Sequence, residues 1–306
     1  MTSASQIYAA LQRLARAEGR PFSEYLTLYA MECFLARLAH TTYKDDVVLK
    51  GGVLLAAYKL RRPTRDIDME AVDFPLDQEN MKAVVVAVAD AVVEDALTID
   101  PSQTTVDPIR DGDEYSGLRV KIASKVHGSA VSFHLDISTG DPIWPAPQTV
   151  DVPRLLGGSV QMSGYPIPMI IAEKSVTILS RGAASTRWRD VVDIRSFAAT
   201  TDFTAGELRK AIESVADHRE VPIASIKAAM VGWAGVAQPK WAAWRRKFAL
   251  ESSTREQFSD QLMEVGEFLD PVFTGRVLNT DRWSHITGSW DSESSASEVA
   301  AVVPDA

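Results

Sequence analysis

The stretch from Lys50 to Met69, KGGVLLAAYKLRRPTRDIDM, constrains the fold more than any other part of this 306-residue chain. Two glycines follow an apolar run, a helix-like segment comes next, and the stretch closes on Asp66-Ile67-Asp68. If these last residues form a strand, alternation places both aspartates on one face and Ile67 on the other, toward a core. The sequence therefore predicts a strand, a helix over 53–60 and a second strand that presents two carboxylates.

Two carboxylates held side by side repel each other unless a cation lies between them, and hard oxygen ligands favour Mg²⁺. Gly51 and Gly52 leave backbone amides unobstructed at a helix start, where an anion is favoured. Each pattern alone is common in turns and on solvated strand faces. Their order, with Arg61, Arg62 and Arg65 between them, favours metal-dependent phosphoryl chemistry with one or two Mg²⁺ ions.

A third carboxylate comes from the predicted strand 131–138, VSFHLDIS, whose apolar residues alternate with Ser132, His134 and Asp136. Asp136 either joins the metal site from a neighbouring strand or is an ordinary exposed strand residue. His134 shares this face, but a lone histidine is weak evidence of a metal ligand. The sequence leaves the role of Asp136 open.

Two helical patterns flank a turn at Gly182, and they are expected to form an antiparallel hairpin. Lys174 and Asp190 are equally distant from Gly182 along the chain, so their side chains can meet. A lysine near a transferred phosphate stabilises the developing negative charge. The simpler interpretation is a structural salt bridge. Asp193 competes with Asp190, because three residues along a helix lie on nearly the same face.

Helical patterns continue from residue 203 to about 269, and no strand is predicted in this part. The patch 240–247, KWAAWRRK, combines cations with tryptophans, as RNA-binding surfaces do. However, Trp241 and Trp244 have the i, i+3 spacing of core residues, which favours a packed helix with cations reaching outward. The predicted domains are a core at 1–165 with two leading helices, a helical domain at 166–285, and a flexible tail at 286–306.

The order Gly-Gly, short helix, Asp-hydrophobic-Asp resembles the polymerase-β-like nucleotidyltransferase superfamily. More narrowly, LKGG, RPTRDID and the later AEK, RG and RWRD motifs resemble the AbiEii/MenT group, the toxins of bacterial type IV toxin–antitoxin systems. One departure is Val53, which stands where the superfamily often has a serine, so backbone amides must contact the phosphate there. The resemblance implies an α/β (α+β) fold, a nucleotidyltransferase-like mixed sheet flanked by helices with a helical C-terminal domain.

The resemblance also implies transfer of a nucleoside monophosphate from an NTP to an RNA acceptor, the tRNA 3′ end, which blocks aminoacylation and translation. The implied catalytic residues are Asp66, Asp68, Lys174 and Asp190. The implied Mg²⁺ ligands are Asp66, Asp68 and Asp136. The NTP is expected to contact Lys50, Gly51, Gly52, Arg62, Thr64 and Arg65. The implied partner is a cognate antitoxin encoded nearby. Transfer to a protein hydroxyl, or a non-catalytic binding module, are the alternative functions.

Bulk properties agree with a globular protein but do not choose a substrate. A net charge of −9 argues against uniform coating of nucleic acid, although a local basic groove is compatible with it. The single cysteine, Cys33, excludes an internal disulfide and suits a reducing cytosol. The N-terminus lacks the apolar stretch of a signal peptide, and no run approaches bilayer length. We therefore expect a soluble, cytoplasmic protein that does not contact membranes.

Overall fold

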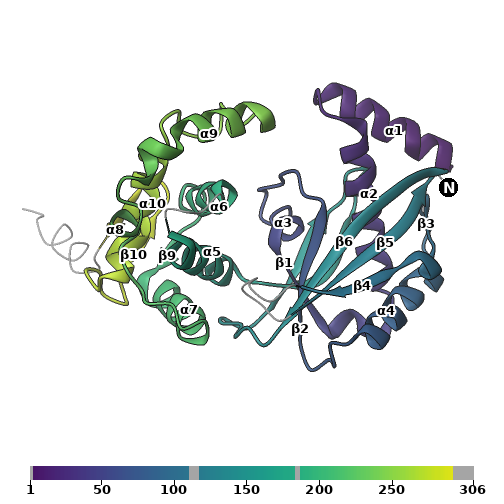
Figure 1. Cartoon of the computed structure of the whole chain (residues 1–306), viewed down its shortest axis with the longest axis horizontal. Helices are drawn as coiled ribbons and strands as arrows, with labels where there is room; N and C mark the ends of the chain where they lie inside the picture. Colours follow the sequence, from purple (N-terminus) through teal and green to yellow (C-terminus); the bar gives the residue numbers. More distant parts are fainter. Residues whose placement is uncertain (1–2, 110–116, 183–186, 292–306) are drawn as a thin grey trace, which may run out of the picture. The chain divides into compact units, whose positions relative to one another are not determined.

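A computed structural model describes residues 3–109, 117–182 and 187–291 of the chain (Figure 1). The chain divides into two compact units. The first contains Met1–Asp141 and Pro147–Tyr165, and the second contains Pro142–Ala146 and Pro166–Ala306. Within the described ranges, no helix has the length and apolarity needed to cross a membrane.

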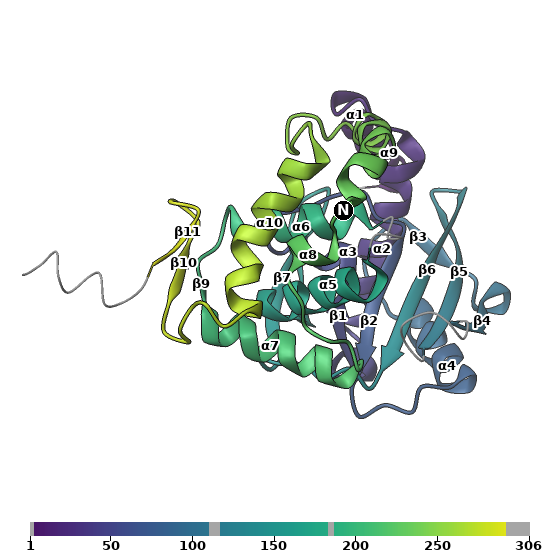
Figure 2. The same ribbon diagram turned by 60° about the vertical axis from the view of Figure 1, so that its left-hand side comes forward.

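The first unit is built on an eight-stranded mixed sheet with the order β3-β5-β6-β2-β1-β8-β7, to which β4 is added through β5. The β2–β6 and β1–β8 pairs are parallel, and the others are antiparallel. Figure 2 shows β2, β6 and β5 side by side. The strands are β1 Val47–Lys50, β2 Asp66–Ala71, β3 Leu97–Ile99, β4 Thr105–Pro108, β5 Gly117–Val126, β6 Ser129–Thr139, β7 Gln148–Pro153 and β8 Ser159–Gly164.

The helices of this unit are α1 Ala4–Ala17, α2 Phe22–Leu38, α3 Gly51–Leu54 and α4 Gln78–Asp90, with short 3₁₀ turns at Thr42–Asp45 and Pro101–Gln103. Helix α2 packs against β5, β6 and β8 of this sheet, and α4 packs against β4. Helix α2 is apolar on nearly every side, as expected for a helix buried between other elements. Its Phe34 packs edge-to-face on Phe133 of β6, with ring centroids 5.8 Å apart. The sheet and its helices confirm the predicted α/β class.

The second unit is mainly helical. It contains α5 Ile167–Arg181, α6 Trp188–Ala198, α7 Ala205–His218, α8 Ile226–Ala229, α9 Trp233–Phe248 and α10 Phe258–Phe273, with a small sheet of β9 Phe203–Thr204, β10 Arg282–Ser284 and β11 Ser289–Asp291. Aromatic rings form much of its core. Trp188 stacks on Trp233 with centroids 5.4 Å apart and planes 10° apart, and Phe258 packs edge-to-face against both rings.

Several predicted elements differ from the observed ones. Helix α3 has four residues instead of extending over 53–60, because the chain continues in turns to Lys59, whose φ is 63°. Strands β7 and β8 are absent from the prediction, and so is the small sheet of the second unit. That sheet is held by tryptophans, because Trp283 Nε1 donates to the Ala198 carbonyl at 2.7 Å and Trp290 stacks on Phe268. Residues 289–291 of the predicted tail form β11, and residues 292–306 lie outside the described residues.

Candidate active site

Strand β2 presents Asp66 and Asp68 on one face. Between and after them, Ile67 and Met69 are 0% and 1% exposed in the core, while both aspartates are partly exposed. Asp68 lies opposite Lys50 of β1 and opposite Asp136 of β6 in the strand register. Directly opposed residues in paired strands share a face, so the alternation predicted from the sequence is confirmed.

Gly51 makes room for the carboxylate of Asp68. Its φ is +66°, and a Cβ added there would lie 1.9 Å from Asp68 Oδ2. No side chain can be accommodated at this distance, and the left-handed backbone conformation disfavours L-residues independently. The first glycine of the motif therefore allows the backbone at the start of α3 to approach Asp68.

The pKa of Asp68 is raised to about 7, mainly by burial and also by the nearby carboxylates of Asp66 and Asp136. Lys50 and a hydrogen bond from the Gly52 backbone oppose this increase. The smaller part of the increase comes from neighbouring negative charge that Lys50 does not fully offset. A divalent cation would offset this remaining charge, and two carboxylates supply the hard oxygen donors that Mg²⁺ prefers. Asp66 and Asp68 therefore fit the metal that the sequence predicts.

Asp136 has a partner of its own. Arg119 of β5 donates from Nε to Asp136 Oδ1 at 2.7 Å and from Nη2 to Oδ2 at 2.5 Å, a bidentate pair. In the described part of the chain, no group of three or more His, Cys, Asp or Glu residues is arranged to hold a metal ion. Asp136 influences Asp68 electrostatically, and its role as a metal ligand stays a prediction.

The Thr64 side chain and the Arg65 backbone fix the position of Asp66. The Thr64 hydroxyl donates to Asp66 Oδ1 at 3.0 Å, and the Arg65 amide donates to the same oxygen at 3.2 Å. A Cβ on Gly52 would lie 2.7 Å from Thr64 Oγ1 and 3.4 Å from Arg62 Nη1. The second glycine thus lets Thr64 and Arg62 approach the start of α3. Contacts of these residues with an NTP stay predictions, but they do surround the glycine pair.

Lys50 is more enclosed than expected for a residue that contacts a triphosphate. It is 8% exposed, and its Nζ lies 2.9 Å from Glu70 Oε2 and 3.5 Å from Asp141 Oδ2. Ser138 Oγ donates to Glu70 Oε2 at 2.6 Å, and the Asp141 amide donates to Oε1 at 3.0 Å. This placement favours a role for Lys50 in balancing buried carboxylates.

Sequence reasoning missed Glu70, although a signal was present: it continues the alternation of Asp66 and Asp68 on β2. It also missed the role of Arg61. Nη1 of Arg61 lies 2.7 Å from Oε1 of buried Glu32 on α2, and its Nη2 donates to the Pro153 carbonyl. Arg61 therefore anchors the loop between α3 and β2. Nothing local in the sequence links it to Glu32.

The second unit contains the other predicted pair. Lys174 Nζ on α5 lies 2.8 Å from Asp190 Oδ1 and 2.8 Å from Asp193 Oδ2, both on α6. Burial alone would raise the pKa of Asp190, but Lys174 and Arg187 lower it to about 2. The predicted contact is present, and Asp193 is a second partner of Lys174 rather than a substitute for Asp190. All three residues are buried, unlike an ordinary surface salt bridge.

The sequence matches the family model described as nucleotidyl transferase AbiEii toxin, type IV TA system, over residues 33–273. The chain belongs to the AbiEii family. No curated protein matches the AbiEii chain. Two crystal structures are similar to it at 16% identity: a candidate nucleotidyltransferase from H. pylori, with a TM-score of 0.46, and JHP933 from Helicobacter pylori, with a TM-score of 0.45. Both matches include 80% of this chain. They include 92% of the first structure's chain and 90% of the JHP933 chain.

Membership of the AbiEii family confirms the resemblance seen in the motifs. The chain is a nucleotidyltransferase of a type IV toxin–antitoxin family, a class that uses an NTP and a divalent metal and is paired with a cognate antitoxin. The family match spans the glycine pair, the aspartates of β2 and the Lys174 cluster. The roles of the individual AbiEii site residues stay predictions.

Proposed function

We propose that this AbiEii toxin transfers a nucleoside monophosphate from an NTP to the 3′ end of tRNA, releases pyrophosphate, and so blocks aminoacylation and translation. The observation that carries the proposal is the position of Asp68 beside Asp66 and Gly51. The backbone approaches the carboxylate at Gly51, and the pKa of Asp68 is raised to about 7 by its burial and, to a smaller extent, by the carboxylates of Asp66 and Asp136.

The residues of the first unit have distinct roles in this reaction. Asp66, oriented by Thr64, and Asp68, positioned against Gly51, would hold Mg²⁺. When bound, this ion neutralises phosphate charge and lowers the pKa of the attacking hydroxyl. The guanidinium of Arg62 lies next to Gly52, and Arg65 directly precedes Asp66 in the chain; guanidinium groups match phosphate oxygens in geometry and charge.

Lys174 and Asp190 are proposed to be needed for transfer as well, as the sequence motifs imply. Asp190 and Asp193 hold the ammonium group of Lys174 on the hairpin from both sides. A point charge fixed in this way is suited to stabilising a phosphate oxygen that gains negative charge. Replacement of Lys174 by arginine keeps the charge and changes the shape, so it tests whether position as well as charge is required.

Transfer can be measured by incubating the full chain with each labelled NTP, Mg²⁺ and total tRNA, followed by sequencing of tRNA 3′ ends. Label in tRNA that is lost in Asp66→Asn and Asp68→Asn, with both variants folded, supports the proposal. A parallel incubation includes cellular protein, and label found only in that protein would instead establish a protein hydroxyl as the acceptor. Absence of label from every NTP and metal combination would leave a binding module as the function.

A further inference from the structure

The C-terminal half of α9 concentrates positive charge. Between Trp233 and Phe248 the helix contains Lys240, Arg245, Arg246 and Lys247 and no acidic residue. The chain as a whole has a net charge of −9. A local positive field of this kind differs in sign from the rest of the protein, and binding follows the local field.

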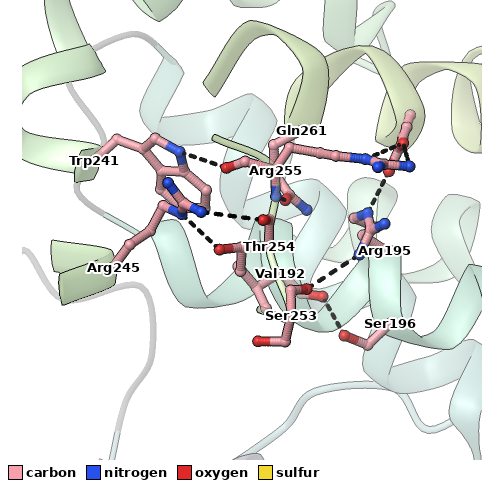
Figure 3. Close-up of polar contacts among 10 residues, drawn as sticks. Val192, Arg195, Ser196, Trp241, Arg245, Ser253, Thr254, Arg255 and Gln261 are labelled. Carbon is pink, nitrogen blue, oxygen red and sulfur yellow. Dashed lines mark hydrogen bonds and ion pairs between the residues drawn. The ribbon is translucent and has the colours of Figure 1, made fainter. Parts of the chain in front are cut away.

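One side of α9 is structural. Trp241 is fully buried and donates from Nε1 to the Arg255 carbonyl at 3.1 Å (Figure 3). Arg245 is also buried, and it donates to Thr254 Oγ1 at 2.7 Å and to the Glu251 carbonyl at 3.1 Å. These contacts pin the loop between α9 and α10, and they confirm the predicted core position of Trp241. The helix is therefore a rigid support for its opposite side.

The opposite side of α9 carries the remaining cations. Lys240 and Lys247 are exposed and lie seven residues apart, which places them on one stripe of the helix. Arg246 is also exposed, about 100° around the helix from Lys247, so it widens the positively charged part of the helix surface. In the described part of the chain, the side chains of Lys240 and Arg246 make neither an ion pair nor a hydrogen bond. Among the described residues, no carboxylate is paired with either of these two cations.

Two aromatic rings border the cations. Trp244 stacks on Trp241 with centroids 5.4 Å apart and planes 20° apart, and it remains partly exposed. Phe248 is also partly exposed, with Lys247 Nζ 5.6 Å and Arg189 Cζ 5.2 Å from its ring centroid. Arg189 precedes Asp190, the partner of Lys174, so the surface extends to the α6 end that holds the lysine cluster within the same unit.

We infer that Lys240, Trp244, Arg246, Lys247 and Phe248, with Arg189, form the surface of the second unit that binds the RNA acceptor. Cations spaced along one stripe of a rigid helix suit a phosphate backbone, and partly exposed rings beside them suit an unpaired base. In a single RNA strand phosphates and unpaired bases alternate, so cations and rings side by side match both of its parts, and RNA is the occupant that we infer. This inference rests on the proposed function and assigns the place where its acceptor binds.

Binding of fluorescently labelled tRNA to the full chain without NTP tests the surface separately from catalysis. We expect Lys240→Glu/Arg246→Glu/Lys247→Glu to raise Kd at least tenfold and to reduce the slope of log Kd against log salt by about 2 to 3. The control Arg13→Glu/Arg16→Glu/Lys82→Glu makes the same change in net charge at exposed positions of the first unit and should bind like wild type.

Trp244→Ala should weaken binding about tenfold, whereas Trp244→Phe should retain most of it.

Melting curves of all variants establish that they are folded. Equal loss of affinity in both triple variants would overturn the inference, since it would show only a response to net charge. Unchanged tRNA affinity with lost antitoxin binding would also overturn it, in favour of an acidic protein at this surface. If wild type labels tRNA and the α9 variant does so with unchanged KM, the surface is wrong and the proposed function stands. If wild type never labels tRNA, the proposed function itself fails.

Discussion

A Cβ on Gly51 would lie 1.9 Å from Oδ2 of Asp68, so the carboxylate can take its position only when residue 51 has no side chain. Gly51→Ala should therefore displace Asp68 and reduce transfer at least 100-fold. The φ of +66° at this position is also unfavourable for alanine, and this strain lowers stability by roughly 1 to 2 kcal/mol. Rates of NMP incorporation and thermal melts measure the two effects.

Gly19→Ala is the matched control for this substitution. Gly19 has φ +64°, and a Cβ there meets nothing within 4 Å. It should show a similar loss of stability with full transfer activity. Equal activity of the Gly51 and Gly19 variants would contradict the close packing of Asp68 on the backbone.

The ionisation of Asp68 should make stability depend on pH. Its pKa is about 7 in the folded protein, above the ordinary value of 3.8, so the folded state binds the proton more tightly than the unfolded chain. The stability associated with this proton is fully present below pH 3.8 and is lost as pH rises through about 7. In EDTA, Asp68→Asn should therefore gain stability relative to wild type across this interval, as measured by urea unfolding.

Divalent metal should reverse that difference. Mg²⁺ at pH 8 should raise the melting temperature of wild type, because it balances the charge of Asp66 and Asp68, and the shift should be small in Asp66→Asn and Asp68→Asn. The same melting experiment with Ca²⁺ and with Mn²⁺ shows which divalent ion the carboxylate oxygens prefer. An equal Mg²⁺ shift in all three proteins would place the metal elsewhere.

Asp190 should have the opposite dependence on pH. Its pKa is lowered to about 2, so it contributes stability that is present above pH 3.8 and is lost as pH falls through about 2. The contribution is about 2 kcal/mol at neutral pH. Asp190→Asn should be less stable than wild type at pH 7, and the difference should shrink toward pH 2. The exposed Asp217→Asn serves as control and should follow the wild-type curve.

Lys50 and Glu70 form a buried pair whose disruption should be costly. Lys50→Met leaves Glu70 and Asp141 without the ammonium group, and removal of one partner of a buried pair typically costs about 3 to 5 kcal/mol. Lys50→Met/Glu70→Gln should recover part of this loss in a double-mutant cycle, and Lys44→Met at an exposed site should cost little. A stable Lys50→Met protein with a raised KM for NTP would instead support the predicted contact with the triphosphate.

The sequence predicted the features that depend on local periodicity. Alternation along β2 placed Asp66 and Asp68 together, and equal distance from Gly182 brought Lys174 to Asp190. Both follow from the geometry of one strand and one helical hairpin, which neighbouring residues determine.

Features that depend on distant contacts were not predictable in the same way. Asp141 approaches Lys50 only because β6 pairs with β2 and carries its following turn to that edge. Arg119 meets Asp136 through the β5–β6 register, which the short apolar runs did not specify. Strands of two or three residues, such as β9 and β10, are too short for alternation to be recognised, and buried tryptophans hold them in place.

The segment Pro142–Ala146 belongs to the second unit, although β6 before it and β7 after it belong to the first. Lys210 Nζ on α7 lies 4.5 Å from the ring centroid of Trp144, which ties this segment to the helical unit. The polypeptide thus passes from one unit to the other at residues 141/142, 146/147 and 165/166. A chimaera joined only at 165/166 would therefore combine the helices of one relative with the 142–146 segment of the other. We expect such a chimaera to be less stable than one in which all three junctions are exchanged together.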